Sequence, residues 1–377
     1  MSVVPFLDLG AGYRELQAEL DDAARRVLSS GWYILGPEVE AFEAEFAAYC
    51  GTEHCVGVGN GLNALELVLR AWGVGQGDEV IVPSNTYIAT WLAVTNIGAR
   101  IVPVEPDRVT GNLDPDRVEA AISRHTRAII PVHLYGQCAD MGPLMEQAQR
   151  HGLLVLEDAA QAHGAEYRGR RAGALGHAAA FSFYPTKNLG AYGDGGAVTT
   201  SDAQLAARLR LLRNYGSAHK YDNESTGTNS RLDPLQAALL RVRLEHLDEW
   251  NARRAAAAAR YGQGLAGDPD LRLPQVPVWS QPVWHVFAVH HPERDQLQAL
   301  LAEQGVQTLI FYPVAPHLSG AFADLGWQEG DFPIAEELAN STLGLPIGPH
   351  TTPDQQDHVI AAVETAAKLL GSAVPGR

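Results

Sequence analysis

The chain has 377 residues, 46% of them hydrophobic, and carries a formal net charge of −16. This content suffices for a large core and predicts about two domains, while the acidic balance argues against nucleic-acid or anionic-membrane partners. Its three cysteines, Cys50, Cys55 and Cys138, are too few for a disulfide framework or a zinc site, so we expect no metal centre. The N-terminus has no secretory pattern and no apolar run approaches about 18 residues, which predicts a soluble cytoplasmic protein.

Short apolar strands alternate with helices over the first 200 residues, after a helical pattern at 13–30 and a helix at 37–51. The strands are predicted at 54–58, 78–84, 99–105, 126–136 and 153–158, and the helices at 62–73, 86–98 and 141–152. Apolar strands in this alternation favour a parallel sheet with helices on both faces. Ligands of such sheets bind at the carboxyl ends of the strands.

The pattern changes after about residue 200. A helix is predicted at 201–216, an irregular polar stretch at 217–233, and a long helix or helix pair at 234–267. Beyond it we expect a strand–helix–strand unit from 283 to 314 and a closing helix at 351–371. This organisation predicts an α/β fold with a large domain at 1–245 and a smaller C-terminal domain at 246–377.

Three strand ends carry residues suited to chemistry. The first is Gly59-Asn60-Gly61, which precedes a helix. Free N–H groups and the helix dipole at such a start can bind an anion, although glycine is also common in ordinary turns of this kind. The second strand end is Asp158, followed by Gln161 and His163. A carboxylate here is either a helix cap or solvated side chain, or the partner of a cationic ring nitrogen.

The third strand end lies in "FSFYPTKNLGAYGDGGAV", residues 181–198. Lys187 stands between an apolar strand and a glycine-rich loop, where removal from water lowers the pKa of a lysine and makes it nucleophilic. A surface lysine is the alternative. Ser182, on the same strand, could donate its hydroxyl to a phosphate. Together an anion cradle, an aspartate and a nucleophilic lysine match what pyridoxal 5′-phosphate (PLP) requires.

Five segments extend this match: "GNGLNALELVLRA", "PSNTYIATWLAV", "EDAAQAHGA", "FSFYPTKNLGAYGDGGAV" and "GTNSRLDPLQAALL". In order and spacing they resemble the sugar-nucleotide aminotransferases of the DegT/StrS type, from about residue 5 to residue 370. The resemblance implies the fold type I of PLP-dependent transferases, with a mostly parallel seven-stranded sheet between helices and a smaller C-terminal α/β domain. It also implies a homodimer whose active sites lie at the subunit interface.

The resemblance assigns roles to individual residues. Lys187 forms the Schiff base with PLP, Asp158 pairs with the pyridine nitrogen, and Gln161 lies near the ring hydroxyl. The phosphate is held by Ser182, Gly61 and Leu62, and by Asn229 from the other subunit. Tyr87 stacks on the ring, at a position where the family often has phenylalanine. Leu62 replaces a more common threonine, so only its amide can serve. From the residues alone, Tyr87 could equally be a core tyrosine.

A closer resemblance covers 213–254 and is to the enzymes that aminate C-3 of dTDP-linked 3-keto-6-deoxyhexoses. It implies transfer of the amino group of L-glutamate to give a dTDP-3-amino-3,6-dideoxyhexose for deoxyaminosugar pathways, including those of antibiotics. Lys187 then serves as general base and general acid. Candidate substrate contacts are His163, Tyr184, Tyr215, His219, Lys220, Tyr221, Arg231, Tyr312 and His317. Of these, His163 and Arg231 could instead be structural.

Three alternatives remain at this point. One is a C-4 sugar-nucleotide aminotransferase, and a second is a non-catalytic PLP-fold sensor. The third is another PLP enzyme; Lys187 argues against a sugar dehydratase, which has histidine at that position, and the late position of the lysine argues against a barrel-type racemase.

Overall fold

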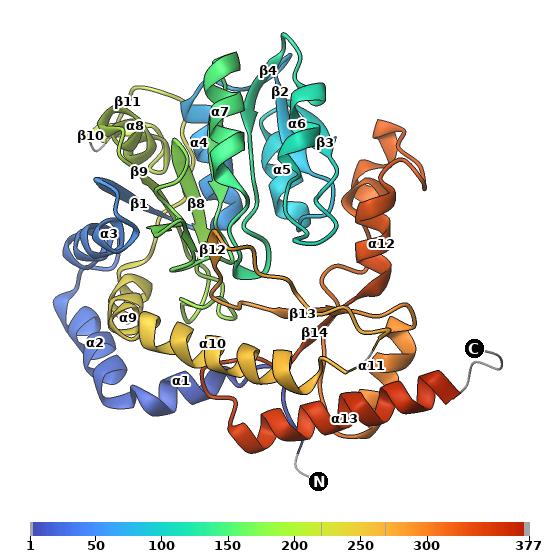
Figure 1. Ribbon diagram of the computed structural model, residues 1–377. Helices are drawn as coiled ribbons and strands as arrows, with labels where there is room; N and C mark the ends of the chain where they lie inside the picture. Colours follow the sequence, from blue (N-terminus) through green and yellow to red (C-terminus); the bar gives the residue numbers. More distant parts are fainter. Residues whose placement is uncertain (1–2, 220, 268, 373–377) are drawn as a thin grey trace.

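A computed structural model describes residues 3–219, 221–267 and 269–372 (Figure 1). Its centre is a seven-stranded sheet in which all strands except β9 run in the same direction. The spatial order of the strands is β1 (His54–Val58), β9 (Gly196–Thr200), β8 (Ala178–Ser182), β5 (Leu154–Asp158), β4 (Thr126–Ile129), β2 (Glu79–Pro83) and β3 (Arg100–Val104). The predicted mostly parallel seven-stranded sheet is therefore confirmed.

Helices cover both faces of this sheet, as continuous apolar strands require. On one face pack α3 (Pro37–Cys50), α6 (Pro115–Ala121), α7 (Met141–His151) and α9 (Pro234–Glu245). On the other face pack α4 (Gly61–Ala71), α5 (Ile88–Asn96) and α8 (Ala203–Leu212). The two faces have separate buried clusters, so each helical layer is held by its own apolar contacts.

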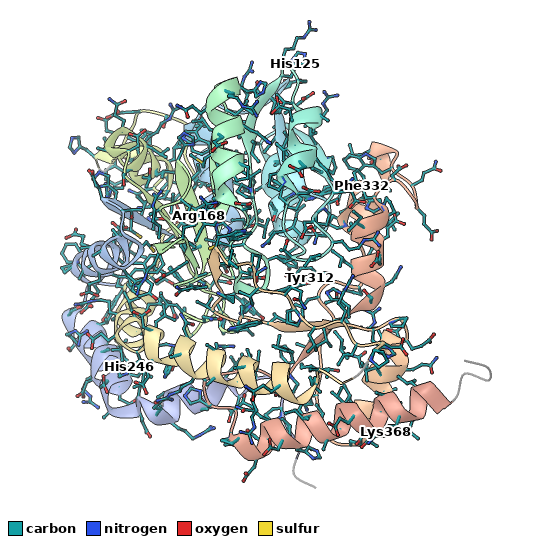
Figure 2. The ribbon with its side chains drawn as sticks, viewed as in Figure 1. His125, Arg168, His246, Tyr312, Phe332 and Lys368 are labelled. Carbon is teal, nitrogen blue, oxygen red and sulfur yellow. The ribbon has the colours of Figure 1, made fainter. Side chains whose placement is uncertain are left out.

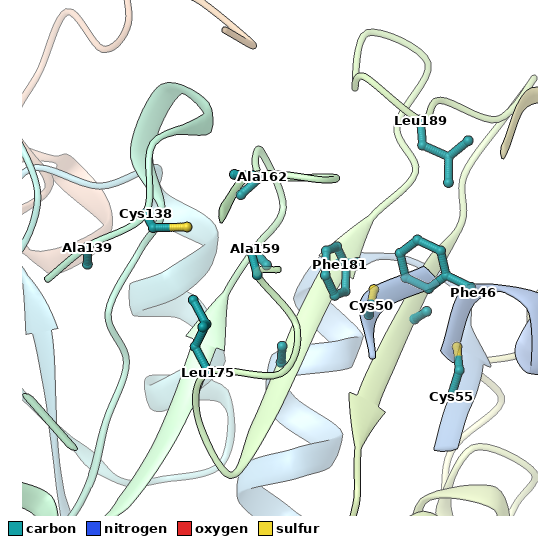
Figure 3. Packing of buried hydrophobic residues seen from close by; sticks show 14 of the residues in the cluster. Phe46, Cys50, Cys55, Cys138, Ala139, Ala159, Ala162, Leu175, Phe181 and Leu189 are labelled. Atoms are coloured by element: carbon teal, nitrogen blue, oxygen red, sulfur yellow. The ribbon is translucent and has the colours of Figure 1, made fainter. Parts of the chain in front are cut away.

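The first cluster explains the three cysteines. Cys50, Cys55 and Cys138 are free and buried among apolar side chains, and Phe46 packs edge-on against Phe181 with ring centroids 4.9 Å apart (Figure 3). Burial raises the pKa of each cysteine thiol, so the thiols stay protonated and serve as small core residues. Among the described residues, no cluster of three or more metal-binding side chains is found.

A second core lies below the sheet in Figure 1. It is formed by α10 (Leu247–Gly264), α11 (Arg294–Glu303), α13 (Pro353–Ser372) and the antiparallel pair β13 (Phe287–His290) and β14 (Thr342–Leu345). Val4 packs into the same cluster and its backbone bridges to Val306. The division of the chain at residue 245 stays a prediction, and it falls where α9 ends and α10 begins.

One predicted element of this part is wrong. We expected a strand at 306–314, but among the described residues this segment makes only isolated bridges at Val306 and Leu309, and β13 pairs with β14. The four residues of β14 follow directly on α12 (Pro333–Ser341). Such a short strand, joined to a helix without a glycine or proline between them, carries no strand pattern in the sequence.

The other elements are peripheral. They are α1 (Leu9–Glu15), α2 (Gln17–Ser30), the hairpin β10 (Ser217–His219) and β11 (Asp222–Asn223), and the small sheet of β6 (Glu166–Tyr167), β7 (Arg170–Arg171) and β12 (Ser280–Gln281). The stretch expected to be irregular thus contains a short hairpin. Within the described ranges, no helix is long and apolar enough to cross a membrane.

Candidate active site

Asp158 is the last residue of β5 and is only 7% exposed. Thr90, on α5, donates its hydroxyl to Asp158 Oδ2 at 2.7 Å, and the amide of Ala160 donates to Oδ1 at 3.3 Å. Burial raises the pKa of the carboxyl, and among the described residues Asp158 makes no ion pair. The strand end therefore presents a buried carboxylate that is available to one cation.

Lys187 lies five residues beyond the end of the neighbouring strand β8, and its amide donates to the carbonyl of Tyr184 at 2.8 Å. Burial lowers the pKa of the lysine to about 8, and the charge of Asp158 offsets part of this shift. A substantial fraction of neutral amine is therefore present near neutral pH. The two residues come from adjacent parallel strands, which is why they meet at one edge of the sheet.

The start of α4 forms an anion cradle at the same edge. Asn60 caps this helix by accepting the amide of Asn63 at 2.9 Å, while the amides of Gly61 and Leu62 belong to the first turn, where no helical carbonyl is available. A Cβ atom on Gly61 would lie 2.8 Å from the Cβ of Ser182. The glycine thus allows the helix start and the Ser182 hydroxyl to approach one anion from two sides.

Gln161 connects the strand end to the C-terminal part of the chain. Its Oε1 accepts the amide of Tyr135 at 2.6 Å, and its Nε2 donates to the hydroxyl of Tyr312 at 2.9 Å. The Tyr312 ring lies 5.1 Å from that of Tyr87, centroid to centroid. Tyr312 stands between the sheet and the second core (Figure 2), so residues far apart in sequence meet around Gln161.

His163 is completely buried against the rings of Phe181 and Phe183, at centroid distances of 5.3 and 5.8 Å. Neither ring nitrogen has a hydrogen-bond partner in the described part of the chain. Burial lowers the pKa of this histidine to about 3, so it is neutral at physiological pH. A direct contact with substrate stays a prediction.

Several predicted substrate contacts lie on the surface. Arg231 donates to Asn214 Oδ1 at 2.9 Å, and its guanidinium carbon lies 5.6 Å from the centroid of the Tyr215 ring. Arg231 is half-buried, and the exposed candidates are Tyr184, Tyr215, His219 and Tyr221. Lys220 lies outside the described residues. Their contacts with substrate stay predictions.

Asn229 is also exposed, and its backbone bridges to Asn214. The next residue, Ser230, accepts the amide of Gly59 at 3.0 Å through its hydroxyl. The segment that carries Asn229 is thus anchored next to the start of α4. The contact between Asn229 and the cofactor phosphate in the other subunit stays a prediction.

His317 lies in a short 3₁₀ helix, Pro316–Leu318, and is 1% exposed. Its Nε2 is 2.9 Å from Glu336 Oε1, and its ring packs against Phe332 at 4.9 Å. These contacts fix the loop that follows Tyr312, and a role in substrate binding stays a prediction.

Three residues near the site had no signal in the sequence. Thr90 lies inside a predicted helix, and Tyr135 and His285 lie in segments predicted as strands. The structure ends the first of these strands at Ile129, so Tyr135 lies beyond it in a short 3₁₀ turn. In the structure His285 Nδ1 is 3.2 Å from Asn188 Oδ1. Burial, followed by the charge of Lys187, lowers the pKa of His285 well below its usual range.

These residues fit pyridoxal phosphate. The α4 cradle suits its phosphate, Asp158 suits a protonated ring nitrogen, and Lys187 suits its aldehyde. The approach of Gly61 to Ser182 is the structural sign of the cradle, because a side chain at position 61 would collide with Ser182.

Comparison with known proteins identifies the family. The model of the DegT/DnrJ/EryC1/StrS aminotransferase family matches residues 14–364. The erythromycin biosynthesis sensory transduction protein EryC1 of Saccharopolyspora erythraea is 60% identical, over 97% of this chain and 100% of its own. The dTDP-3-amino-3,4,6-trideoxy-alpha-D-glucose transaminase of Streptomyces venezuelae is 59% identical, over 98% of each chain.

The structural match is equally extensive. A crystal structure of S. venezuelae DesV in complex with a ketimine intermediate superposes with a TM-score of 0.96, at 59% identity, over 98% of this chain and 99% of that one. Aminotransferases of this family depend on PLP, and related structures contain PLP or its amine form. The chain therefore belongs to the DegT/DnrJ/EryC1/StrS family and is a PLP-dependent aminotransferase.

Proposed function

We propose that the protein transfers the amino group of L-glutamate to C-3 of a dTDP-linked 3-keto-6-deoxyhexose. The product is a dTDP-3-amino-3,6-dideoxyhexose. One observation carries the proposal. A buried carboxylate, Asp158, and an amine of lowered pKa, Lys187, lie at the same edge of the sheet. The S. venezuelae relative, whose name specifies a 3-amino dTDP sugar, supports the choice of C-3 and of dTDP.

When bound, PLP supplies an aldehyde that exchanges with amines and a ring that withdraws electrons from the substrate α-carbon. Asp158 holds the positive charge of the ring nitrogen, and the amides of Gly61 and Leu62 with the Ser182 hydroxyl hold the phosphate. The Lys187 amine removes the proton from the α-carbon of the amino donor and delivers it to the C4′ carbon of the cofactor. A pKa of about 8 suits this exchange, because the amine can both accept and release a proton near neutral pH.

We also propose a cytoplasmic homodimer. The segment between α2 and α3 exposes consecutive bulky side chains, Trp32, Tyr33 and Ile34, at 58%, 55% and 50%, and Leu28 nearby is 61% exposed. Large apolar side chains that cluster on a surface favour an interface between protein chains. Sedimentation at twice the mass of the 40.6 kDa chain tests this proposal.

A second candidate function is a sensor, because the printed name of the S. erythraea relative describes sensory transduction. The residues around Lys187 favour catalysis. A protein that only bound PLP would need the phosphate cradle but no amine of lowered pKa next to a buried carboxylate.

The experiment that tests the proposal follows the visible absorbance of the PLP-loaded protein as L-glutamate is added. We expect loss of the cofactor band and formation of one equivalent of 2-oxoglutarate. The resulting amine form is then offered a panel of dTDP-ketosugars, 3-keto and 4-keto, with and without a 4-hydroxyl. The 3-keto compounds should restore the band. Restoration only by 4-keto sugars would move the reaction to C-4, and no change with any donor would favour the sensor.

The lowered pKa of Lys187 predicts the pH dependence of cofactor uptake. Only a neutral amine attacks an aldehyde, so the rate at which cofactor-free protein takes up PLP should rise between pH 7 and 9, with a midpoint near 8. With a lysine of ordinary pKa, near 10.5, the rate of PLP uptake would still rise about tenfold per pH unit at pH 9. Stopped-flow absorbance measures the rate, and a midpoint above pH 10 would contradict the burial of the amine.

A further inference from the structure

A small pocket, open to solvent, lies next to Lys187, on the side of the N-terminal segment. It lies between α1, the end of α9, α10 and the loop before α13. Its lining includes Lys187, Arg243, Arg254, Trp250, Asp8 and His350. The site described above uses only one of these residues, Lys187.

The cavity is electropositive. Among the described lining residues Asp8 is the one acidic group, and it pairs with Arg14, whereas Lys187, Arg243 and Arg254 are basic. Arg254 is 3% exposed and, within the described part of the chain, donates only to backbone carbonyls, those of Trp284 and Ile347, at 3.2 and 3.1 Å. Its charge is therefore buried without a carboxylate partner, and the local field favours an anion.

Arg243 has a buried N–H group to spare. Its guanidinium carbon lies 5.1 Å from the ring centroid of Trp250 and 5.5 Å from that of Tyr192. Among the described residues it makes no ion pair, and its buried Nε has no hydrogen-bond acceptor. By contrast Arg241, two residues earlier on α9, pairs with both Glu38 and Glu45 at 2.7 Å.

A half-buried guanidinium next to aromatic rings, with an unused Nε–H group, is suited to a planar carboxylate. The amino donor must bring its α-carbon to the Lys187 amine, and its carboxylate is one bond from that carbon. An anion site for the donor therefore has to lie within a few ångströms of Lys187, as this cavity does. A nucleoside diphosphate sugar, with its three rings and two phosphates, is too large to share so small a space with the cofactor.

We propose that Arg243 binds a carboxylate of the amino donor, with the charge of Arg254 in support. The proposal rests on the aminotransferase function proposed above and adds the residue that selects an acidic or α-carboxylate donor over a simple amine. Arg243 acts here by binding and orienting the donor, and Lys187 remains the group that moves the proton.

The test compares Arg243→Gln with Arg241→Gln, a matched change on the same helix that removes an arginine already paired with glutamates. In Arg243→Gln the apparent dissociation constant for L-glutamate, from the loss of the cofactor band, should rise roughly 10- to 100-fold. The KM for the dTDP-ketosugar should stay within about twofold of wild type. Arg241→Gln should match wild type in both, and Arg243→Lys should recover part of the affinity.

A second readout needs no turnover. Succinate, a dicarboxylate without an amine, should bind the PLP-loaded wild-type protein in a calorimetric titration and should bind Arg243→Gln at least about tenfold more weakly. An unchanged response to both L-glutamate and succinate would overturn the proposal. A loss of affinity confined to the dTDP-ketosugar would also overturn it, because the anion site would then belong to the diphosphate. An equal loss of affinity for both substrates would overturn it too, because it would indicate a structural role for Arg243. Failure of the wild-type protein to react with L-glutamate would instead overturn the proposed function.

Discussion

Replacement of Lys187 by alanine should abolish turnover while leaving the fold intact. The amine is both the attachment point for PLP and the group that carries the proton, so its loss should lower the rate with L-glutamate by at least about 10³-fold. The side chain makes no ion pair or side-chain hydrogen bond among the described residues, so the thermal midpoint should change little. Single-turnover absorbance and a thermal melt measure the two effects.

The composition of the chain makes this test unusually direct. The sequence contains only three lysines, Lys187, Lys220 and Lys368. Borohydride reduction of the PLP-loaded protein fixes the cofactor on the lysine that holds it, and peptide mass spectrometry should find it on Lys187. Lys368→Ala, at an exposed position on α13 (Figure 2), is the matched control and should behave as wild type. Normal turnover in Lys187→Ala, or label on Lys368, would refute the mechanism.

The sequence predicted the parts of the site that depend on strand order. Asp158 and Lys187 follow apolar strands, and Gly61 follows another at a helix start. Parallel strands bring their carboxyl ends to one edge, so residues that follow such strands meet there whatever their separation in sequence. The same rule predicted the mostly parallel sheet, because fully apolar strands alternating with helices leave few other arrangements.

The sequence could not predict the residues that approach this edge from other directions. Thr90 reaches Asp158 from inside a helix, and Tyr135 presents its amide to Gln161 from a turn with a positive φ of 59°. Nothing in the sequence distinguishes Arg243 from Arg241, and only the folded chain brings Arg243 to the same pocket as Lys187. Such contacts are set by how helices pack on the sheet, which periodicity along one chain does not encode.

Replacement of Asp158 by asparagine should produce the second large effect. Asparagine has the same shape and can still accept the Thr90 hydroxyl, but it has no charge with which to hold the proton on a pyridine nitrogen. Loss of one partner from a buried ion pair costs about 3–5 kcal/mol, which corresponds to a roughly 10²- to 10⁴-fold fall in the rate of proton removal from L-glutamate. PLP should also dissociate more readily from the variant. Single-turnover kinetics and equilibrium dialysis measure the two changes.

Thr90→Val is the matched control for the hydrogen bond, since it removes the hydroxyl donor and keeps the carboxylate. This variant should lower the rate by at most about tenfold. One hydrogen bond to a charged group contributes about that much at the low end of its usual range. A PLP analogue methylated at the ring nitrogen carries a permanent positive charge and should return part of the lost rate to Asp158→Asn, because the charge no longer depends on the protein. Full activity of Asp158→Asn with ordinary PLP would place the counter-charge elsewhere. A loss that the methylated analogue leaves unchanged would mean that Asp158 acts through the geometry of the strand end and not through its charge.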